Sequence, residues 1–531
     1  MNNSNLKPLP LGTSDFAALR SEGQIYVDKT SLIYEIASKR QKFFLSRPRR
    51  FGKSLLISTF ESLFKYGLRD FKGLAIEKLW RDTGTYQVVR LDFSEIKDFS
   101  SAEEFSVRLT SVLSRGFSGC GFTYRESPIE TVSDQISDWL KTIPLNSLVL
   151  LIDEYDAPLT ACLSKPQLFE DIRKKLSDFY ATIKSNDGAV RFFFMTGITK
   201  FSKTSIFSEL NHFTDLSLMA EFGSLLGYTH AEVEQYFSGY LDRAAEILNM
   251  DRGDLLSELT RHYDGFCFEK TAKQHLFSPW SLLKFLNYPS NGFENYWYES
   301  GGKPTALLQY FQSHSLKSPL DFDKEKLLDM DDLTASSDVD EISDVALLTQ
   351  AGYLTIKNVE EDTAFVGYPN LEVKKSMARL YMKLLLKGQT QVQAGAGGAL
   401  KILTEGSAQE LYHRLNRLFL SLDYQSYPAK DEYAVRGIVQ IYVTCTGLSA
   451  KVENHNALGR SDLEVRAGNN YWVFEFKYCR EGENSEQLLQ EAVEQIQNRH
   501  YGEQVSTEKL IKVALVFSEK ERQFIRWKSL D

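Results

Sequence analysis

The sequence predicts an α/β protein of several domains, with a parallel sheet near the N-terminus and a separate, smaller sheet near the C-terminus. A chain of 531 residues is too long for one hydrophobic core. Over the first two hundred residues, short apolar runs alternate with helical patterns, which is typical of parallel sheets covered by helices. A small, polar, glycine-rich stretch at 387–400 then suggests a linker before a second group of helices and strands.

Four apolar runs in the first part of the chain predict buried strands, at 42–46, 88–94, 147–156 and 191–197. Apolar residues at helical spacing predict a helix over 54–67 between the first two. From about Tyr228 the pattern becomes mainly helical, and residues 347–373 resemble a short hairpin. The expected domains are therefore 1–225, 226–386 and 400–531.

Composition limits the possible partners. The net charge of −9 argues against a basic coat for nucleic acid over the whole surface, although a local basic groove remains compatible with it. Five scattered cysteines without a CxxC pair argue against disulfides and zinc, and they suit a reducing compartment. The chain has neither a secretory signal nor an apolar run of membrane-spanning length. We therefore expect a cytoplasmic protein without a membrane partner.

The segment RPRRFGKS predicts a phosphate-binding loop, because Gly52-Lys53-Ser54 follows a predicted strand and opens a predicted helix. Backbone N–H groups would face the phosphates, Lys53 would neutralise them, and the Ser54 hydroxyl would reach Mg²⁺. Such loops usually begin with glycine, whereas Arg47 stands in that position here. A basic surface turn is the alternative interpretation of the segment taken alone.

A second segment, LVLLIDEYD, supports the nucleotide interpretation. Asp153 at the end of an apolar strand would hold the Mg²⁺ shell, and Glu154 would polarise the attacking water. The alternative is a buried strand that ends in an acidic turn. Thr196, at the end of RFFFM, is a candidate contact for the γ-phosphate, and turn capping is an equally good interpretation of it.

A third segment, GRSDLEVRAGNNYWVFEFKY, predicts an antiparallel hairpin whose turn lies at 467–470. With Ala467 facing Asn470, Asp462 comes to lie opposite Glu475. Glu475 and Lys477 then share one face of the strand, and the aromatic residues between them take the other.

Two facing carboxylates repel each other unless a cation bridges them, and Mg²⁺ takes oxygen ligands of this kind. Asp462 and Glu475 are therefore candidate metal ligands for phosphodiester hydrolysis, and Lys477 would position water or offset developing charge. A solvated, charged hairpin face is the alternative.

Several segments together resemble a bacterial AAA-ATPase-like family whose members commonly carry a C-terminal PD-(D/E)xK nuclease domain. The resemblance covers nearly the whole chain and is carried, in order, by YVDKTSLI, FFLSRPRRFGKSLL, LLIDEYDAPL, FFFMTGITKFSKTSIFSELN, YDGFCF, FSPWSLLKFL, AGYLTIK and YPNLEVKKS. It implies an AAA-like P-loop domain, a helical, winged-helix-like middle region and a restriction-endonuclease-like α/β domain. A loop led by RPRRFGKS is itself typical of the group.

The resemblance also implies site residues. ATP would lie on Arg49, Arg50, Phe51, Gly52, Lys53 and Ser54, with Asp153 as the metal-linked acid and Glu154 as the catalytic acid. Glu453 matches an acidic position ahead of the GR-x-D segment and would complete the second metal shell, although a surface salt bridge explains it equally well.

Three further positions, one departure from the family and two matches, carry no assigned chemistry. Ser278 stands where the family usually has asparagine, outside the expected phosphate site. Asp28-Lys29-Thr30 and Tyr263-Asp264-Gly265 match as well, and we expect structural roles for both.

The sequence therefore predicts an ATP-hydrolysing module coupled to a Mg²⁺-dependent nuclease that acts on nucleic acid, with DNA favoured over RNA. A homo-oligomer and a role in defence against foreign DNA are compatible with this architecture. The main alternative is an ATP-dependent switch whose nuclease-like domain binds nucleic acid or protein without cleaving. A nucleic-acid motor is a third interpretation, disfavoured because no helicase motif is visible.

Overall fold

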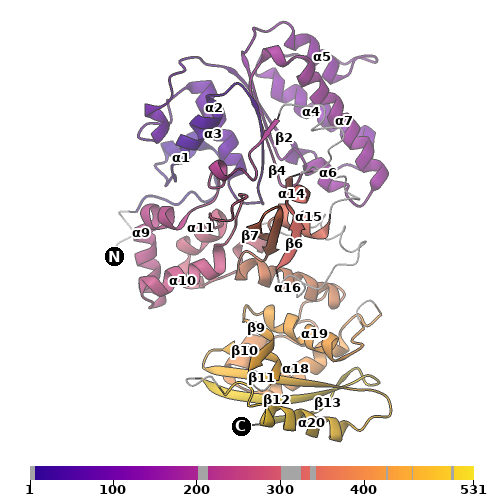
Figure 1. The fold of residues 1–531 in the computed structure, drawn as a ribbon. Coiled ribbons are helices and arrows are strands. Elements are labelled where there is room, and N and C mark those ends of the chain that lie inside the picture. Colours follow the sequence, from indigo (N-terminus) through magenta and orange to yellow (C-terminus); the bar gives the residue numbers. More distant parts are fainter. Residues whose placement is uncertain are drawn as a thin grey trace. The chain divides into compact units, whose positions relative to one another are not determined.

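The computed structural model describes residues 6–200, 213–299, 325–334, 343–425, 428–456, 459–503 and 508–530. Its contacts form two compact units, divided between Asn370 and Leu371 (Figure 1). The expected linker at 387–400 is wrong, because Ala396 is fully buried in the core of the second unit. Small side chains there permit close packing, and the Tyr442 hydroxyl donates to the Ala396 carbonyl at 2.6 Å. The three domain boundaries stay predictions.

A five-stranded parallel sheet organises the first unit, with the order β2-β3-β4-β1-β5. The strands are β1 (Lys42–Ser46), β2 (Gln87–Asp92), β3 (Leu148–Asp153), β4 (Val190–Gly197) and β5 (Phe213–Asp215). The first four coincide with the four predicted apolar runs. Because the strands are parallel, the carboxyl ends of β1, β3 and β4 lie at one edge, and β4 separates β1 from β3.

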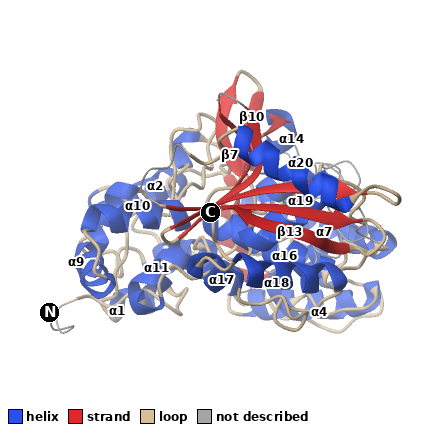
Figure 2. Cartoon of the chain, turned by 90° about the horizontal axis from the view of Figure 1, so that it is seen from below, coloured by secondary structure: helices blue, strands red, loops and turns tan. Residues whose placement is uncertain are grey.

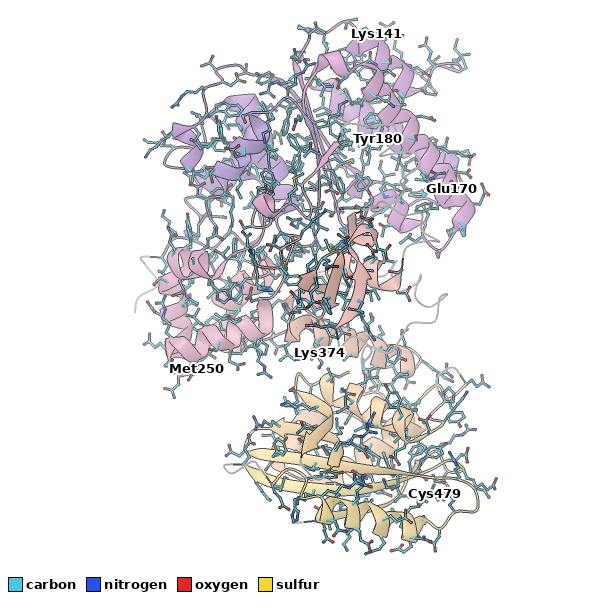
Figure 3. All side chains as sticks on the ribbon, viewed as in Figure 1. Lys141, Glu170, Tyr180, Met250, Lys374 and Cys479 are labelled. Carbon is cyan, nitrogen blue, oxygen red and sulfur yellow. The ribbon has the colours of Figure 1, made fainter. Side chains whose placement is uncertain are left out.

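Helices cover this sheet on both sides (Figure 1). One side carries α1 (Phe16–Ser21), α2 (Thr30–Ala37) and α3 (Lys53–Tyr66), and the other carries α4 (Ala102–Ser118), α5 (Val132–Leu140) and α7 (Pro166–Ser185), with the short α6 (Ala157–Ala161) before it. Apolar residues at helical spacing point each helix toward the sheet; Tyr180 of α7, labelled in Figure 3, is fully buried. Burial raises the pKa of this phenol.

The middle region is rich in helices: α9 (His230–Leu248), α10 (Arg252–Tyr263), α11 (Pro279–Asn287), α12 (Tyr296–Glu299), α14 (Met330–Thr334) and α15 (Asp344–Gln350). A capping box between Thr229 and Glu232 starts α9, and Asn249 ends it in the left-handed conformation before the turn at Met250 (Figure 3). A small antiparallel sheet of order β6-β8-β7 comprises β6 (Lys326–Asp329), β7 (Thr355–Glu360) and β8 (Thr363–Gly367). The predicted hairpin is β7–β8.

The second unit is a mixed five-stranded sheet of order β13-β12-β11-β10-β9 (Figure 2). Its strands are β9 (Ala450–Asn456), β10 (Gly459–Ala467), β11 (Asn470–Cys479), β12 (Lys509–Ser518) and β13 (Gln523–Leu530). The parallel pair β11–β12 requires a crossover, which α20 (Ser485–Asn498) supplies on one face. On the other face lie α16 (Leu371–Leu385), α17 (Ala399–Glu405), α18 (Ala408–Leu420) and α19 (Glu432–Thr444). The predicted α/β fold class is confirmed.

Within the described segments, none of the helices combines the length and the apolar character that crossing a membrane requires.

Candidate active sites

The predicted phosphate loop connects β1 to α3. Gly52 caps α3 with φ of +93°, a left-handed conformation that glycine adopts without strain, and Lys53 is the first helical residue. The Lys53 ammonium is buried and donates to the carbonyls of Arg47 and Pro48 at 2.9 and 3.0 Å. Burial lowers the pKa of Lys53, while Glu154 and Asp153 oppose that effect. The loop thus holds a cation at a helix N-terminus, the arrangement that suits phosphate.

Arg47 occupies the position at which phosphate loops usually have their first glycine, and its side chain is buried. Its guanidinium is 1% exposed and donates to the carbonyls of Ser46, Ser217 and Phe222 at 2.9, 2.8 and 3.1 Å. It also lies 4.5 Å from the ring centre of Phe268. Burial lowers the pKa of Arg47 to about 9. The arginine therefore fastens the start of the loop to neighbouring backbone rather than meeting solvent or ligand.

The outer side of the loop packs against the middle region. Phe51 lies edge-on to Phe266, with ring centres 4.8 Å apart, and the Trp297 indole donates to the Arg49 carbonyl at 3.2 Å. Gly352, with φ of +85°, approaches Pro48 so closely that a Cβ there would lie 2.4 Å from the proline Cγ. The segments AGYLTIK and YDGFCF therefore hold the phosphate loop in place.

This close approach predicts the effect of Gly352→Ala. The added methyl would clash with Pro48 and strain a left-handed backbone, and we expect a loss of about 3 kcal/mol in the free energy of unfolding. Gly73→Ala is the matched control, because Gly73 has φ of +79° and no atom within 4 Å of the added methyl. We expect it to lose only about 1 kcal/mol. Denaturant titration measures both, and equal losses would contradict the close packing of the loop.

The acidic segment lies at the end of β3, beside the end of β4. The Asp153 carboxylate accepts from the Thr196 hydroxyl at 2.6 Å and from the Glu154 N–H at 3.1 Å. Glu154 has φ of +49°, a left-handed conformation that is uncommon for a non-glycine residue. Burial raises the pKa of Glu154, and nearby Lys53 opposes the rise. Thr196 thus orients Asp153, and its predicted contact with a γ-phosphate stays a prediction.

A cavity of about 590 Å³ lies between the phosphate loop and Glu154, and Asp153 and Thr196 are not among the described residues that line it. Its wall includes the loop residues Arg49, Arg50, Gly52, Lys53 and Ser54, together with Glu154 and, from α11, Pro279 and Trp280. A cavity of this size suits a nucleotide. Ser278 itself is buried at the N-cap of α11 and does not line the cavity, but the two residues after it do. The FSPWS segment therefore borders the cavity beside the phosphate loop.

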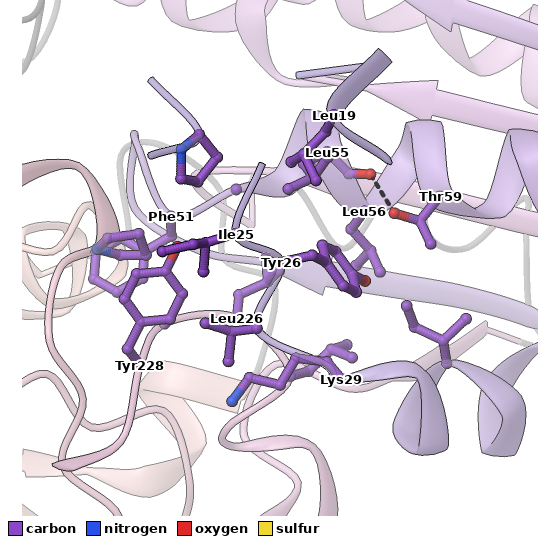
Figure 4. Close-up of a pocket in the computed structure, with 17 residues that line it drawn as sticks. Leu19, Ile25, Tyr26, Lys29, Phe51, Leu55, Leu56, Thr59, Leu226 and Tyr228 are labelled. Atoms are coloured by element: carbon purple, nitrogen blue, oxygen red, sulfur yellow. Dashed lines mark hydrogen bonds between the residues drawn. The ribbon is translucent and has the colours of Figure 1, made fainter. Parts of the chain in front are cut away.

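Figure 4 shows a second, apolar cavity, of about 80 Å³. Leu19, Ile25, Leu55 and Leu226 contribute apolar side chains to it. Both cavities share Gly52, Leu55, Tyr228 and Pro279.

Two further motifs have structural contacts in this unit. Asp28 accepts from the Thr30 and Ala75 N–H groups at 2.9 and 2.8 Å, which ties the start of α2 to a neighbouring turn. Asp264 pairs with His230 at 2.8 Å, and Gly265 passes so close to Pro369 that a Cβ would meet its carbonyl oxygen at 2.2 Å. These contacts agree with the structural roles expected for Asp28-Lys29-Thr30 and Tyr263-Asp264-Gly265.

In the second unit, the predicted hairpin forms with the predicted register. Ala467 pairs with Asn470, and the ladder continues to Leu463 and Phe474. The N–H of Phe476 donates at 2.8 Å to Asp462, whose side chain therefore reaches across to β11. Trp472, Phe474 and Phe476 belong to the core under α19, and the alternate residues Tyr471, Val473 and Cys479 to the core under α20. The predicted division of faces is confirmed.

The charged groups of the hairpin lie in a largely buried cluster. Lys477 Nζ lies 3.2 Å from Glu475 Oε1, and the other oxygen of Glu475 is buried with no hydrogen-bond partner within the described part of the chain. Burial and then the Asp462 charge raise the pKa of Glu475 to about 7, and burial also raises the pKa of Asp462. Burial lowers the pKa of Lys477, but the neighbouring carboxylates outweigh it and the net direction is upward. A bound cation would offset both the repulsion between these carboxylates and the cost of burying their charge.

Glu432, the first residue of α19, is a member of this cluster that sequence reasoning missed. Its carboxylate lies 3.9 Å from Lys477 Nζ, and Arg436, one turn later, lies 3.6 Å from the Asp462 carboxylate. Glu464, also buried, is instead occupied by hydrogen bonds from Ser461 and Tyr471. Glu453 lies on β9, and its side chain is outside the described residues. Its role stays a prediction.

The donor set of the cluster fits a divalent cation of the magnesium type. Among the described residues, no three His, Cys, Asp or Glu side chains are grouped closely enough to hold a metal by themselves. Mg²⁺ commonly takes only one or two carboxylates and fills its remaining positions with water and substrate phosphate. Asp462 and Glu475, with its unpartnered buried oxygen, match that pattern.

The raised pKa of Glu475 predicts how Glu475→Gln depends on pH. An acid whose folded pKa lies above its unfolded value destabilises the fold progressively as pH rises from about 4.5 to 7. Glutamine removes this penalty, so we expect it to raise the melting temperature by several degrees at pH 8 and by little at pH 5. Thermal melts at both pH values test this; a gain that does not depend on pH would contradict the buried, charged carboxylate.

Comparison with known proteins agrees with the two kinds of domain. Residues 10–207 match the family model described as a predicted AAA-ATPase, and residues 430–527 match that of the PD-(D/E)XK nuclease superfamily. The chain is 30% identical over 482 residues to "Uncharacterized protein in vnfD 5'region" of Azotobacter chroococcum mcd 1, covering 89% of each chain.

Among solved structures, the chain is similar to the ORC2 protein of Aeropyrum pernix in ADPNP–ADP complexes, at 12% identity, 85% and 90% coverage and a TM-score of 0.21. A likeness of that degree carries no argument. The family models and the long match in sequence carry the assignment, and they agree with the two sheets of the fold. The chain belongs to the family of predicted AAA-ATPases that end in a PD-(D/E)XK nuclease-superfamily domain.

Proposed function

We propose that this protein binds and hydrolyses ATP in its first unit and cleaves nucleic-acid phosphodiester bonds, with Mg²⁺, in its second. The observation that carries the proposal is the cluster at β11, where a buried Glu475 with an unpartnered oxygen lies beside Asp462 and Lys477. Burying such charges is costly, and a solvated hairpin face would not require it. Defence against foreign DNA is a setting that suits this pairing of domains.

At the nucleotide site, each residue would have a role that follows from its position. Lys53 would exchange the carbonyls of Arg47 and Pro48 for the phosphates of ATP, and the N-terminus of α3 would add its N–H groups. The nucleoside would lie toward Tyr228 and Pro279, which both cavities share. Ser54 and Asp153 would hold Mg²⁺, which offsets phosphate charge when bound. Glu154 would accept a proton from the attacking water, a role that its raised pKa favours.

At the nuclease-like site, Asp462 and Glu475 would hold Mg²⁺, which polarises the phosphodiester and makes a bound water more acidic. Lys477, fixed by Glu475 and Glu432, would donate to the phosphate oxygen on which negative charge develops. Glu432 is placed to accept a proton from water, because burial raises its pKa while its side chain remains partly exposed.

A second candidate function is a switch in which the nuclease-like unit binds nucleic acid without cutting it. The observation that favours it is Arg436, which already supplies a cation to Asp462. One experiment separates the two: purified protein is incubated with end-labelled DNA and RNA, single- and double-stranded, with Mg²⁺ or Ca²⁺, and with no nucleotide, ADP, ATP or a non-hydrolysable analogue. Cleavage of any substrate with Mg²⁺ supports the nuclease; retention without cutting in every condition supports the switch.

A further inference from the structure

The first turns of α19 present an aromatic ring and an arginine beside the nuclease-like cluster. Tyr433 is 66% exposed, the largest fraction of any tyrosine among the exposed apolar side chains of the described residues. The Arg436 guanidinium lies 4.9 Å from its ring centre and 3.6 Å from the Asp462 carboxylate. Arg436 is itself 7% exposed. A buried guanidinium thus stands between a solvent-facing ring and a carboxylate of the site.

A second tyrosine and arginine at the same spacing show what an ordinary surface pair looks like. Arg69 packs 3.7 Å from the ring centre of Tyr66, but it is half exposed and bonded to Asp70, its neighbour in sequence. Among the interactions that Tyr66 and Arg69 make in the described part of the chain, none involves a predicted site residue. The Arg436 charge is buried beside the site, and burying a charge costs free energy. The exposed Arg69 charge carries no such cost.

We propose that Tyr433 and Arg436 form a docking subsite for single-stranded nucleic acid next to the acid cluster; this rests on the proposed nuclease function. The Arg436 guanidinium attracts the phosphate of a strand whose next phosphate lies at Asp462 and Glu475. The open ring of Tyr433 stacks on a base. Stacking requires a base free of its own neighbours, so the subsite favours a single strand over a duplex.

Charge within the cluster supports this role for Arg436. Its described ion pair joins it to Asp462, one of the two carboxylates with the donor set for a divalent cation. An Asp462 carboxylate shared with such a cation cancels less of the guanidinium charge, so a phosphate beside Asp462 meets a more positive field. Lys477 also has Glu432, a carboxylate outside that donor set, and so it stays in place.

The test measures binding, not cleavage, with the full chain in Ca²⁺. Fluorescence anisotropy compares an end-labelled oligothymidine of twenty nucleotides with an abasic strand of the same length. We expect Tyr433→Ala to weaken binding of oligothymidine about tenfold and of the abasic strand very little, because only stacking is lost. Arg436→Gln should weaken both strands and lower the slope of log affinity against log salt by about 0.7, the value for one lost phosphate contact on a single strand. Arg436→Lys should retain most of that slope.

Tyr66→Ala is the matched control and should bind both strands like the wild type. Because Tyr433 is exposed, Tyr433→Ala should remain folded. It therefore tests base stacking even if the Arg436 variants unfold the second unit. If Tyr433→Ala binds oligothymidine like Tyr66→Ala, or weakens both strands equally, the subsite is wrong. If the wild type itself binds no DNA or RNA strand, the proposed nuclease function fails, which is a different result.

Discussion

Asp462→Asn and Lys477→Ala should each lower Mg²⁺-dependent cleavage of nucleic acid by roughly a thousandfold, the scale of losing a metal ligand or a transition-state cation. Asp462→Asn is the sharper variant. Asparagine keeps the shape of the side chain and an oxygen to accept from the Phe476 N–H, but it loses the charge that a metal needs. A large loss of cleavage without a fall in melting temperature would therefore assign Asp462 to chemistry and not to the hairpin. Rates on labelled oligonucleotides measure the effect.

Lys477→Ala carries a structural consequence that its position predicts. Removing the ammonium leaves the buried Glu475 without its 3.2 Å partner, so that carboxylate should take up a proton and the melting temperature should fall. Lys520→Ala, which breaks an exposed pair with Glu481, is the control and should change neither property. Wild-type cleavage by Lys477→Ala would place the catalytic site elsewhere.

The second large effect concerns ATP. Lys53→Ala should weaken ATP binding by roughly a hundredfold, because it removes the buried cation that the phosphates would meet. Glu154→Gln should leave ATP bound but lower its hydrolysis by roughly a factor of 10³, since only acceptance of the water proton is lost. Calorimetry and phosphate release measure the two quantities on the same samples.

The same helix and the same residue type provide controls for these variants. Lys65→Ala removes an exposed lysine from the last turn of α3, and Glu170→Gln removes an exposed carboxylate from α7. Both should bind and hydrolyse ATP like the wild type. Hydrolysis by Glu154→Gln at the rate of Glu170→Gln would remove Glu154 from the mechanism.

Much of this molecule could be predicted from short sequence segments, because turns and strand–loop–helix segments depend on interactions between residues close together in the chain. The turn at 467–470 fixes the pairing of β10 with β11, and pairing fixes which side chains share a face. Likewise, a strand that runs into Gly52-Lys53-Ser54 and a helix needs no distant partner to present a phosphate loop. The hairpin and the phosphate loop could therefore be predicted from the sequence alone.

What the sequence did not reveal depends on residues far apart along the chain. Gly352 and Trp297 contact the phosphate loop from about three hundred and two hundred and fifty positions away, and no periodicity marks such contacts. Glu432 was missed for another reason: an acid in the first turn of a helix is ordinary, since it suits the helix dipole. The stretch at 387–400 looked like a linker because small residues serve both flexible chains and tight packing.

The packing of the phosphate loop also has a thermodynamic consequence for nucleotide binding. A glycine-led loop loses backbone freedom when it closes around phosphates, and that entropy opposes binding. Here Arg47, Phe51 and Pro48 are already fixed by Phe222, Phe266 and Gly352 when the chain folds. The ordering entropy is therefore lost during folding and not on ligand capture, so ATP should bind with a small heat-capacity change and little slowing of association.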